Sequence, residues 1–308
     1  MGPESTSTGA PRSPRGALAA AAAFLIWGVF PLYWKQMEGL DSLELISHRL
    51  VWSLVFLAAV LALRHGFGPV AAALRSRRIL AQSAVSGGAL SLNWLTYVWA
   101  VNHGYIIESS LGYFLVPLVN VAIGALVMHE RLRPLSWVAI VCAAAGVALL
   151  VFGVGRLPWI ALALAATWGL YGLMRKRSSL GALDGLAVET AIYLPLAAGY
   201  LVWREHAGVG ALGHADLKTA ALILSAGWIT ALPLVLFAYG ARRIRMMTLG
   251  LLQYVTPSVQ FLCGLLVYSE PFDAPRLRAC CLIWMGLALY TADSFLEQRG
   301  RFRAPAGS

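Results

Sequence analysis

Residues 108–130, ESSLGYFLVPLVNVAIGALVMHE, form an apolar run with a proline near its centre. A near-copy of this run follows 140 positions later, and the register holds without a gap over two apolar stretches. The corresponding pairs are Pro117 and Pro257, Gly124 and Gly264, Glu130 and Glu270, and Gly146 and Gly286. A repeat at constant spacing indicates that two similar structural units follow one another along the chain.

The composition indicates a membrane protein. Hydrophobic residues make up 59% of the 308 residues and charged residues only 12%, whereas soluble domains carry about 25% charged residues. Apolar runs of about 20 residues recur along nearly the whole chain, which is typical of helices that cross a bilayer. The net charge of +10 is carried mainly in short loops between these runs. There it sets membrane orientation, so we expect no nucleic-acid partner.

These runs predict an all-α polytopic membrane protein with ten transmembrane helices. The predicted spans are 17–37, 42–63, 79–101, 106–128, 134–153, 157–174, 185–203, 217–239, 247–268 and 275–295. We expect a disordered cytoplasmic N-terminus (1–16), a first five-helix repeat (17–153), a second (157–295) and a basic cytoplasmic tail (296–308). Because five is odd, the second unit crosses the membrane in the opposite sense. Many transporters use such inverted repeats to alternate access to one central site.

Side chains within the spans are candidates for lining that site. Tyr113 and Asn120 correspond to Gln253 and Gln260 at the offset of 140. Tyr113 and Asn120 share a helical face with Pro117, and Gln253 and Gln260 share one with Pro257. The full set of pathway candidates is Trp27, Asn93, Tyr97, Tyr113, Asn120, Trp168, Gln253 and Gln260. Buried polar groups need partners in the protein or in a wet cavity. The alternative, that these side chains only hold helices together, stays open.

The repeated prolines predict bent helices. Pro117 and Pro257 each lack a backbone N–H, so we expect each to kink its helix near the bilayer midplane. Trp27 and Trp168 also correspond, at an offset of 141, and each is followed by glycine. Such an aromatic pair would suit a mostly apolar or aromatic solute.

Ionisable residues inside the spans are few. Glu44 and His48 are four residues apart in the second span, with Arg49 beside them. Such groups are candidates for coupling or gating, because burying them in a membrane is costly. The alternative is a static pair of Glu44 with His48 or with Arg49. We expect uncoupled, gradient-driven flux or, failing that, proton coupling through Glu44 and His48.

Several clusters resemble a known family. They are FLIWGVFPLYWK (24–35), HRLVWS (48–53), NWLTYVWAVN (93–102), ESSLGYFLVPLVN (108–120), YGLMRK (171–176) and TLGLLQYVTPSVQ (248–260). Together they resemble the RarD proteins of the EamA family, in the drug/metabolite transporter (DMT) superfamily. The resemblance covers 17–295. It implies a fold of five plus five helices, with a central cavity lined by spans 1, 3, 4, 6, 8 and 9.

The expected function is that of a secondary transporter (permease) in the bacterial cytoplasmic membrane. The resemblance implies that it moves small metabolites or drug-like solutes, and we expect export. The sequence contains no Walker loop and no G-x-S-x-G motif, so we expect no enzyme, cofactor or metal. The alternatives are a membrane-embedded enzyme acting on a lipid or isoprenoid, and a non-transporting scaffold. The expected partners are a small-molecule solute and membrane lipid, with the oligomeric state open between monomer and homodimer.

The basic residues predict the orientation, which cysteine labelling can test. Seventeen of the 24 Lys and Arg residues fall on the side of the termini, so both termini should face the cytoplasm and Arg156 the outside. A membrane-impermeant thiol reagent should label a Gly155→Cys variant in intact cells and leave a Ser76→Cys variant unlabelled. The reverse pattern would overturn this topology.

Overall fold

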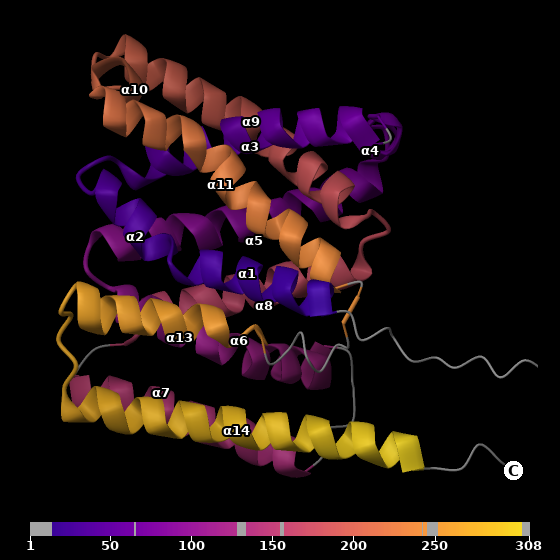
Figure 1. Ribbon diagram of the computed structural model, residues 1–308, viewed down its shortest axis with the longest axis vertical. Coiled ribbons are helices and arrows are strands. Elements are labelled where there is room, and N and C mark those ends of the chain that lie inside the picture. The colour runs from indigo at the N-terminus through magenta and orange to yellow at the C-terminus, as the bar shows by residue number, and fades with distance from the viewer. Residues whose placement is uncertain are drawn as a thin grey trace, which may run out of the picture.

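The computed structural model describes residues 14–64, 66–127, 134–154, 157–241, 243–244 and 252–303. Every regular element in these ranges is a helix, and the helices lie side by side across the view of Figure 1. The long helices are α1 (Pro14–Gly28), α3 (Ser42–Arg64), α5 (Arg77–Asn102), α6 (Ile106–Val127), α7 (Pro134–Val154), α8 (Trp159–Arg177), α9 (Ala182–His206), α11 (Leu217–Ala241) and α14 (Ala274–Arg303). The short elements are α2 (Phe30–Trp34), η1 (Lys35–Met37), α4 (Gly68–Leu74), α10 (Ala211–His214), α13 (Val255–Leu262) and η2 (Cys263–Val267).

Most helix bounds lie within three residues of the predicted spans. The exceptions are α13, which begins at Val255 where the predicted span begins at 247, α14, which continues to Arg303 past the predicted end at 295, and the first span. The first span is broken into α1 and α2–η1, which are bent by 42° relative to each other. Pro31 lies in the first turn of α2. It has no N–H for the carbonyl of Trp27 and its ring crowds that carbonyl, so the helix bends there. The predicted span 185–203 contains Pro195, yet α9 is continuous through it.

The described residues form an all-α fold with several apolar helices. Three helical segments are individually long and apolar enough to cross a membrane: Ser42–Arg64, Ala182–His206 and Leu217–Phe237. The bent pair Pro14–Gly28 and Phe30–Met37 qualifies as a fourth if it is one span. Shorter apolar segments occur at Ile106–Asn120, Trp137–Phe152 and Val255–Val267. The chain is thus a polytopic helical membrane protein, and the count of ten spans stays a prediction.

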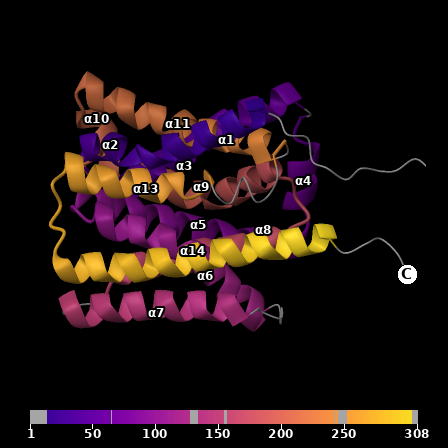
Figure 2. The same ribbon diagram turned by 60° about the horizontal axis from the view of Figure 1, so that its bottom comes forward.

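The helices pack in the pattern that the sequence repeat predicts. Under the offset, α1, α3, α5, α6 and α7 correspond to α8, α9, α11, α13 and α14. Contacts between elements occur in matching pairs. The contact of α1 with α13 matches that of α8 with α6, and the contact of α1 with α11 matches that of α8 with α5. The contact of α3 with α11 matches that of α9 with α5. Three of the corresponding pairs also pack on each other: α3 with α9, α6 with α13, and α7 with α14, the last along one face in Figures 1 and 2.

Corresponding glycines make corresponding contacts. A Cβ on Gly28 would lie 2.7 Å from Val259, and one on Gly169 would lie 2.9 Å from Val119, the counterpart of Val259. Glycine at these positions lets α1 and α8 approach their neighbours closely, which is how helices associate in membranes.

The two units run in opposite directions. Lys35, which follows α2, donates from Nζ to the carbonyl of Asn102 at the end of α5. Trp159, the first residue of α8, has its ring centroid 5.4 Å from that of Trp99, near the same end of α5. The first span of one unit therefore ends where the first span of the other begins. The start of α1 and the end of α14 both lie at the opposite end of the bundle (Figure 1).

The α7–α14 contact gives a stability prediction. A Cβ on Gly146 would lie 2.9 Å from the carbonyl oxygen of Ala279, and one on Gly286 2.7 Å from that of Ala139. Gly146→Ala and Gly286→Ala should each cost about 1–3 kcal/mol through overpacking, measured by thermal unfolding in detergent. Gly199→Ala in α9 is the matched control, because a Cβ there meets nothing within 4 Å. Equal melting temperatures for all three variants would contradict the prediction.

Candidate functional site

A cavity of about 110 Å³ lies among the helices that contact each other between the two units. Its walls are mainly aromatic and apolar, with one arginine and three uncharged polar side chains from α13 and the turn before it. The lining residues include Trp27, Phe30, Arg49, Trp94, Tyr97, Tyr113, Val116, Trp168, Tyr171, Leu234, Gln253, Thr256, Pro257 and Gln260. A mostly apolar cavity with a few polar groups is typical of a small-molecule site.

Both units contribute to these walls, nine lining residues from the first and eight from the second. Five lining pairs differ by 140 or 141 positions: Trp27 and Trp168, Phe30 and Tyr171, Trp94 and Leu234, Tyr113 and Gln253, and Val116 and Thr256. The repeat is therefore kept in the shape of the cavity. It is not kept in polarity, because aromatic rings of the first unit correspond to an aliphatic or amide side chain in the second.

The structure brings six of the eight predicted pathway residues to the cavity. These are Trp27, Tyr97, Tyr113, Trp168, Gln253 and Gln260. Asn93 lies behind the wall. It is fully buried, donates from Nδ2 to the carbonyl of Leu164 and to Thr167 Oγ1, both at 2.9 Å, and accepts from Tyr113 Oη at 3.1 Å. Its contacts place it as the link between α5 and α8 that orients the Tyr113 ring.

Asn120 also lies away from the cavity. It is exposed, and its Oδ1 lies 3.7 Å from where a Cβ on Gly169 would be. Asn120 is seven positions after Tyr113 on the same helical face of α6, but it does not reach the cavity. The last part of α6 lies against α8 instead.

The two prolines have different local settings. Pro117 lies inside α6, which is continuous through it. Pro257 lines the cavity but sits in the first turn of α13, preceded by a turn at Gln253 and Tyr254. A missing N–H causes no loss in the first turn of a helix. Pro257 is therefore placed as the start of a helix and not as a kink in its interior.

Gln260 compensates for the break in the first span. Its Nε2 donates to the carbonyl of Trp27 at 3.1 Å, which is the carbonyl that Pro31 leaves without an N–H. The same Nε2 lies 3.3 Å from Tyr97 Oη. The Oε1 of Gln260 is buried and has no hydrogen-bond partner among the described residues. This amide joins both units at the cavity and leaves one acceptor unused.

The three ionisable residues of α3 have separate surroundings. Glu44 pairs with neither His48 nor Arg49: it accepts from Arg204 Nη2 at 2.8 Å and from the N–H of Ala211 at 2.6 Å. His48 is buried outside the cavity lining. Arg49 lines the cavity, with its guanidinium carbon 4.1 Å from the centroid of the Trp94 ring.

A second buried acid stands outside the set of coupling candidates predicted from the sequence. Glu189 is two turns into α9, 2% exposed, and accepts from Ser86 Oγ at 2.6 Å, with Arg175 Nη1 at 3.6 Å. It lines a small chamber of about 20 Å³ that shares Arg49 and several leucines with the central cavity. The signal was available in the repeat, since Glu189 corresponds to Arg49 at an offset of 140.

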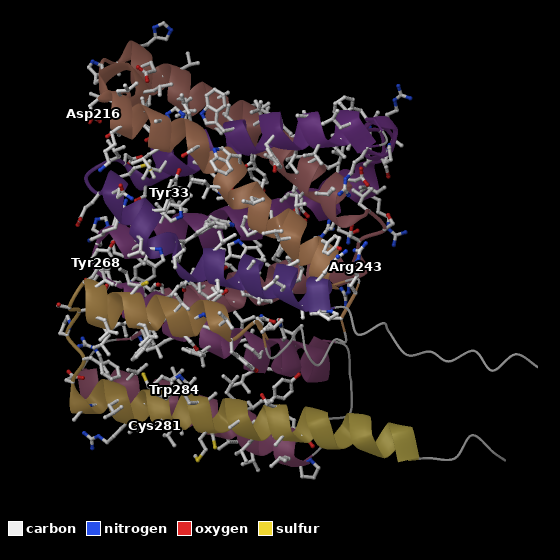
Figure 3. All side chains as sticks on the ribbon, in the orientation of Figure 1. Tyr33, Asp216, Arg243, Tyr268, Cys281 and Trp284 are labelled. Atoms are coloured by element: carbon white, nitrogen blue, oxygen red, sulfur yellow. The ribbon has the colours of Figure 1, made fainter. Side chains whose placement is uncertain are left out.

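Polar contacts also join elements at the ends of the bundle, away from the cavity. Tyr33 donates from Oη to the carbonyl of Leu222, and Tyr268 has Lys35 Nζ 5.9 Å from its ring centroid. Figure 3 shows Tyr33, Tyr268 and Asp216 toward one end and Arg243 at the other. Glu270 lies in the turn after η2 and accepts from the N–H groups of Ile106 and Ile107, so it caps α6. Glu130, its counterpart, lies outside the described residues.

A helical bundle with a central cavity between two corresponding units is typical of polytopic membrane transporters. The model of the EamA-like transporter family matches residues 14–152. The uncharacterized transporter YojE of Bacillus subtilis is 42% identical, over 90% of this chain and 93% of that relative. Protein RarD of Streptomyces exfoliatus is 39% identical, over 95% and 93%. The chain therefore belongs to the EamA family of transporters, among its RarD proteins, and is a bacterial multi-pass membrane protein.

Two further matches agree with this assignment. The chloramphenicol-sensitive protein RarD of Pseudomonas aeruginosa is 31% identical over 92% of this chain and 95% of that relative. A solved crystal structure superposes with a TM-score of 0.57 at 20% identity, over 90% of this chain and 96% of that one. That likeness supports the fold alone.

The positions of Asn93 and Gln253 predict different effects of the same substitution. Asn93→Leu should lower the melting temperature, because it removes interhelical hydrogen bonds that are worth about 0.6–1.7 kcal/mol each in membranes. Gln253→Leu, on the cavity wall, should keep the melting temperature of the wild type. Thermal unfolding of both variants in one detergent makes the comparison. If Asn93→Leu melts like the wild type, the linking role is refuted.

Proposed function

We propose that this protein is a secondary carrier that exports small metabolites or drug-like solutes by alternating access around the central cavity. The observation that carries the proposal is the cavity itself, which lies between corresponding units and is lined by five corresponding pairs of residues. Two inverted units that enclose one site can exchange their conformations, so that the site opens first to one side and then to the other.

The packing around the cavity supports a conformation closed toward the η1 end. Trp34, Met37 and Val101 lie one to two turns beyond lining residues Phe30 and Tyr97 and are each at most 1% exposed. They belong to one apolar cluster that joins α2, η1, α3, α5 and α11. A solute leaving toward this end would have to separate that cluster. The opposite end of the cavity has Tyr171 on its wall, near the ion pair of the buried Glu189 with the partly exposed Arg175.

The proposed orientation places the α1 start and the α14 end on the cytoplasmic side. Basic side chains support this, because Arg15, Arg64, Arg77 and Arg177 lie at that end of their helices. An excess of Lys and Arg marks the cytoplasmic side of membrane proteins. The closed end would then face outward. The direction of transport rests on the likeness to the family, and chloramphenicol is the first solute to test, given the name of the Pseudomonas relative.

Filling the cavity tests the carrier function. Val116 is 1% exposed and lines the cavity, and Thr256 is its counterpart on the other wall. In proteoliposomes, Val116→Trp and Thr256→Trp should each lower solute flux at least tenfold, because an indole occupies the space of the solute. The flux assay uses chloramphenicol and any compound that raises the melting temperature in a metabolite screen.

The matched control is Val85→Trp, because Val85 is 50% exposed on α5 and lies outside the cavity lining. This variant should keep the flux of the wild type. Folding of all three variants is checked by their melting temperatures. Unchanged flux in a folded Val116→Trp or Thr256→Trp variant would exclude this cavity as the pathway.

A further inference from the structure

Arg49 is a buried cation on the wall of the cavity. It is 5% exposed and lines both the central cavity and the small chamber beside it. Its guanidinium lies over the Trp94 ring, and its Nε has no hydrogen-bond partner among the described residues. A guanidinium keeps its proton in proteins, so this position carries a positive charge.

The buried acids near Arg49 are engaged elsewhere. Glu44 pairs with Arg204 at 2.8 Å, and Glu189 has Ser86 at 2.6 Å and Arg175 at 3.6 Å. In the part of the chain that the structure describes, no carboxylate lies within ion-pair distance of Arg49. The charge of Glu189 in the adjoining chamber is thus balanced by Arg175, and the charge of Arg49 is left over.

An uncompensated buried charge is costly. Leaving one charge of a buried ion pair without its partner strongly destabilises a protein, and a cation–π contact recovers only part of that loss. The Trp94 face therefore offsets only part of the cost. A planar guanidinium that faces a cavity matches a carboxylate, which it can bind through two parallel hydrogen bonds.

The rest of the cavity wall indicates the chemical character of the remainder of the solute molecule. Trp27, Phe30 and Trp168 supply aromatic walls from both units. Such walls accept a flat or apolar body, which gains from burial and from edge or stacked contacts with the rings. The unused Oε1 of Gln260 adds one hydrogen-bond acceptor on the same cavity.

We propose that the solute is an amphipathic organic anion whose carboxylate binds Arg49 while its apolar body lies among the aromatic walls. This inference rests on the proposed carrier function and names the chemical class of its solute. Arg49 is then the residue that determines specificity: a neutral analogue of the same shape leaves the guanidinium without a partner, and such a loss weakens binding strongly.

Matched acid and amide probes test this directly. The purified full-length protein is heated in detergent with indole-3-acetate, phenylacetate, their neutral amides, or acetate, all at equal concentration. A bound solute raises the melting temperature according to its concentration and affinity. The two aromatic carboxylates should raise it, and the amides and acetate should bind at least tenfold more weakly. Binding is preferred to flux here because weak acids also cross lipid in neutral form.

Three variants separate a binding role of Arg49 from a structural one. Arg49→Gln should lose the preference for acid over amide, and without ligand it should melt no lower than the wild type, since an unpaired buried charge is removed. Arg49→Lys should keep part of the preference, because lysine keeps the positive charge but lacks the paired N–H donors of the planar guanidinium. Arg278→Gln is the control, because Arg278 is exposed on α14, and none of the described residues of α14 lines the cavity. It should behave as the wild type.

The outcomes distinguish the two proposals. Equal shifts with acid and amide in the wild type, or an unchanged acid shift in Arg49→Gln, would overturn the anion inference. If an uncharged solute binds instead and Val116→Trp blocks its flux, the anion inference fails and the carrier function stands. If no solute of either kind binds or moves, the carrier function itself fails.

Discussion

The bundle depends on the close approach of helix backbones at a small number of corresponding glycines. In a bilayer the hydrophobic effect does not drive helices together, since lipid is as apolar as the side chains, so association relies on van der Waals packing at small residues. Gly28 and Gly169 hold the first helix of each unit against the fourth helix of the other unit, and Gly146 and Gly286 hold α7 against α14. Helices held this closely leave the space between the units to larger side chains, and the cavity lies there.

Hydrogen bonding then settles the details of that space. The break at Pro31 leaves the Trp27 carbonyl without its usual partner, and Gln260, 233 positions away, provides one. Asn93 fixes the Tyr113 ring by binding α8 behind it. Unpaired backbone groups are too costly at membrane depth to be tolerated in lipid. The bent first span thus depends on a hydrogen bond from the second unit, and this bond joins the two units at their shared site.

Charge distribution separates the parts of the molecule that are structural from the part that faces a solute. Glu44, Glu189 and Glu270 each have partners within the protein, and each joins elements distant in sequence. Arg49 stands at the position of the first unit that corresponds to Glu189 in the second. The repeat therefore preserves shape and inverts charge, and only one of the two charges faces the central cavity. A symmetric scaffold thereby contains an asymmetric site, which can bind a solute in one orientation.

The amino-acid sequence by itself determined the repeat register, the all-α membrane class and most helix bounds, because apolar runs and their spacing are local properties of the chain. It also identified the corresponding Trp27 and Trp168. Tertiary structure alone decided which polar groups face the cavity, since the rotation of each helix is set by packing against its neighbours. Asn93 turned toward α8, and Arg49 toward the site. Glu44 found its partner in Arg204, which lies 160 positions away, and no local spacing rule could have selected that residue.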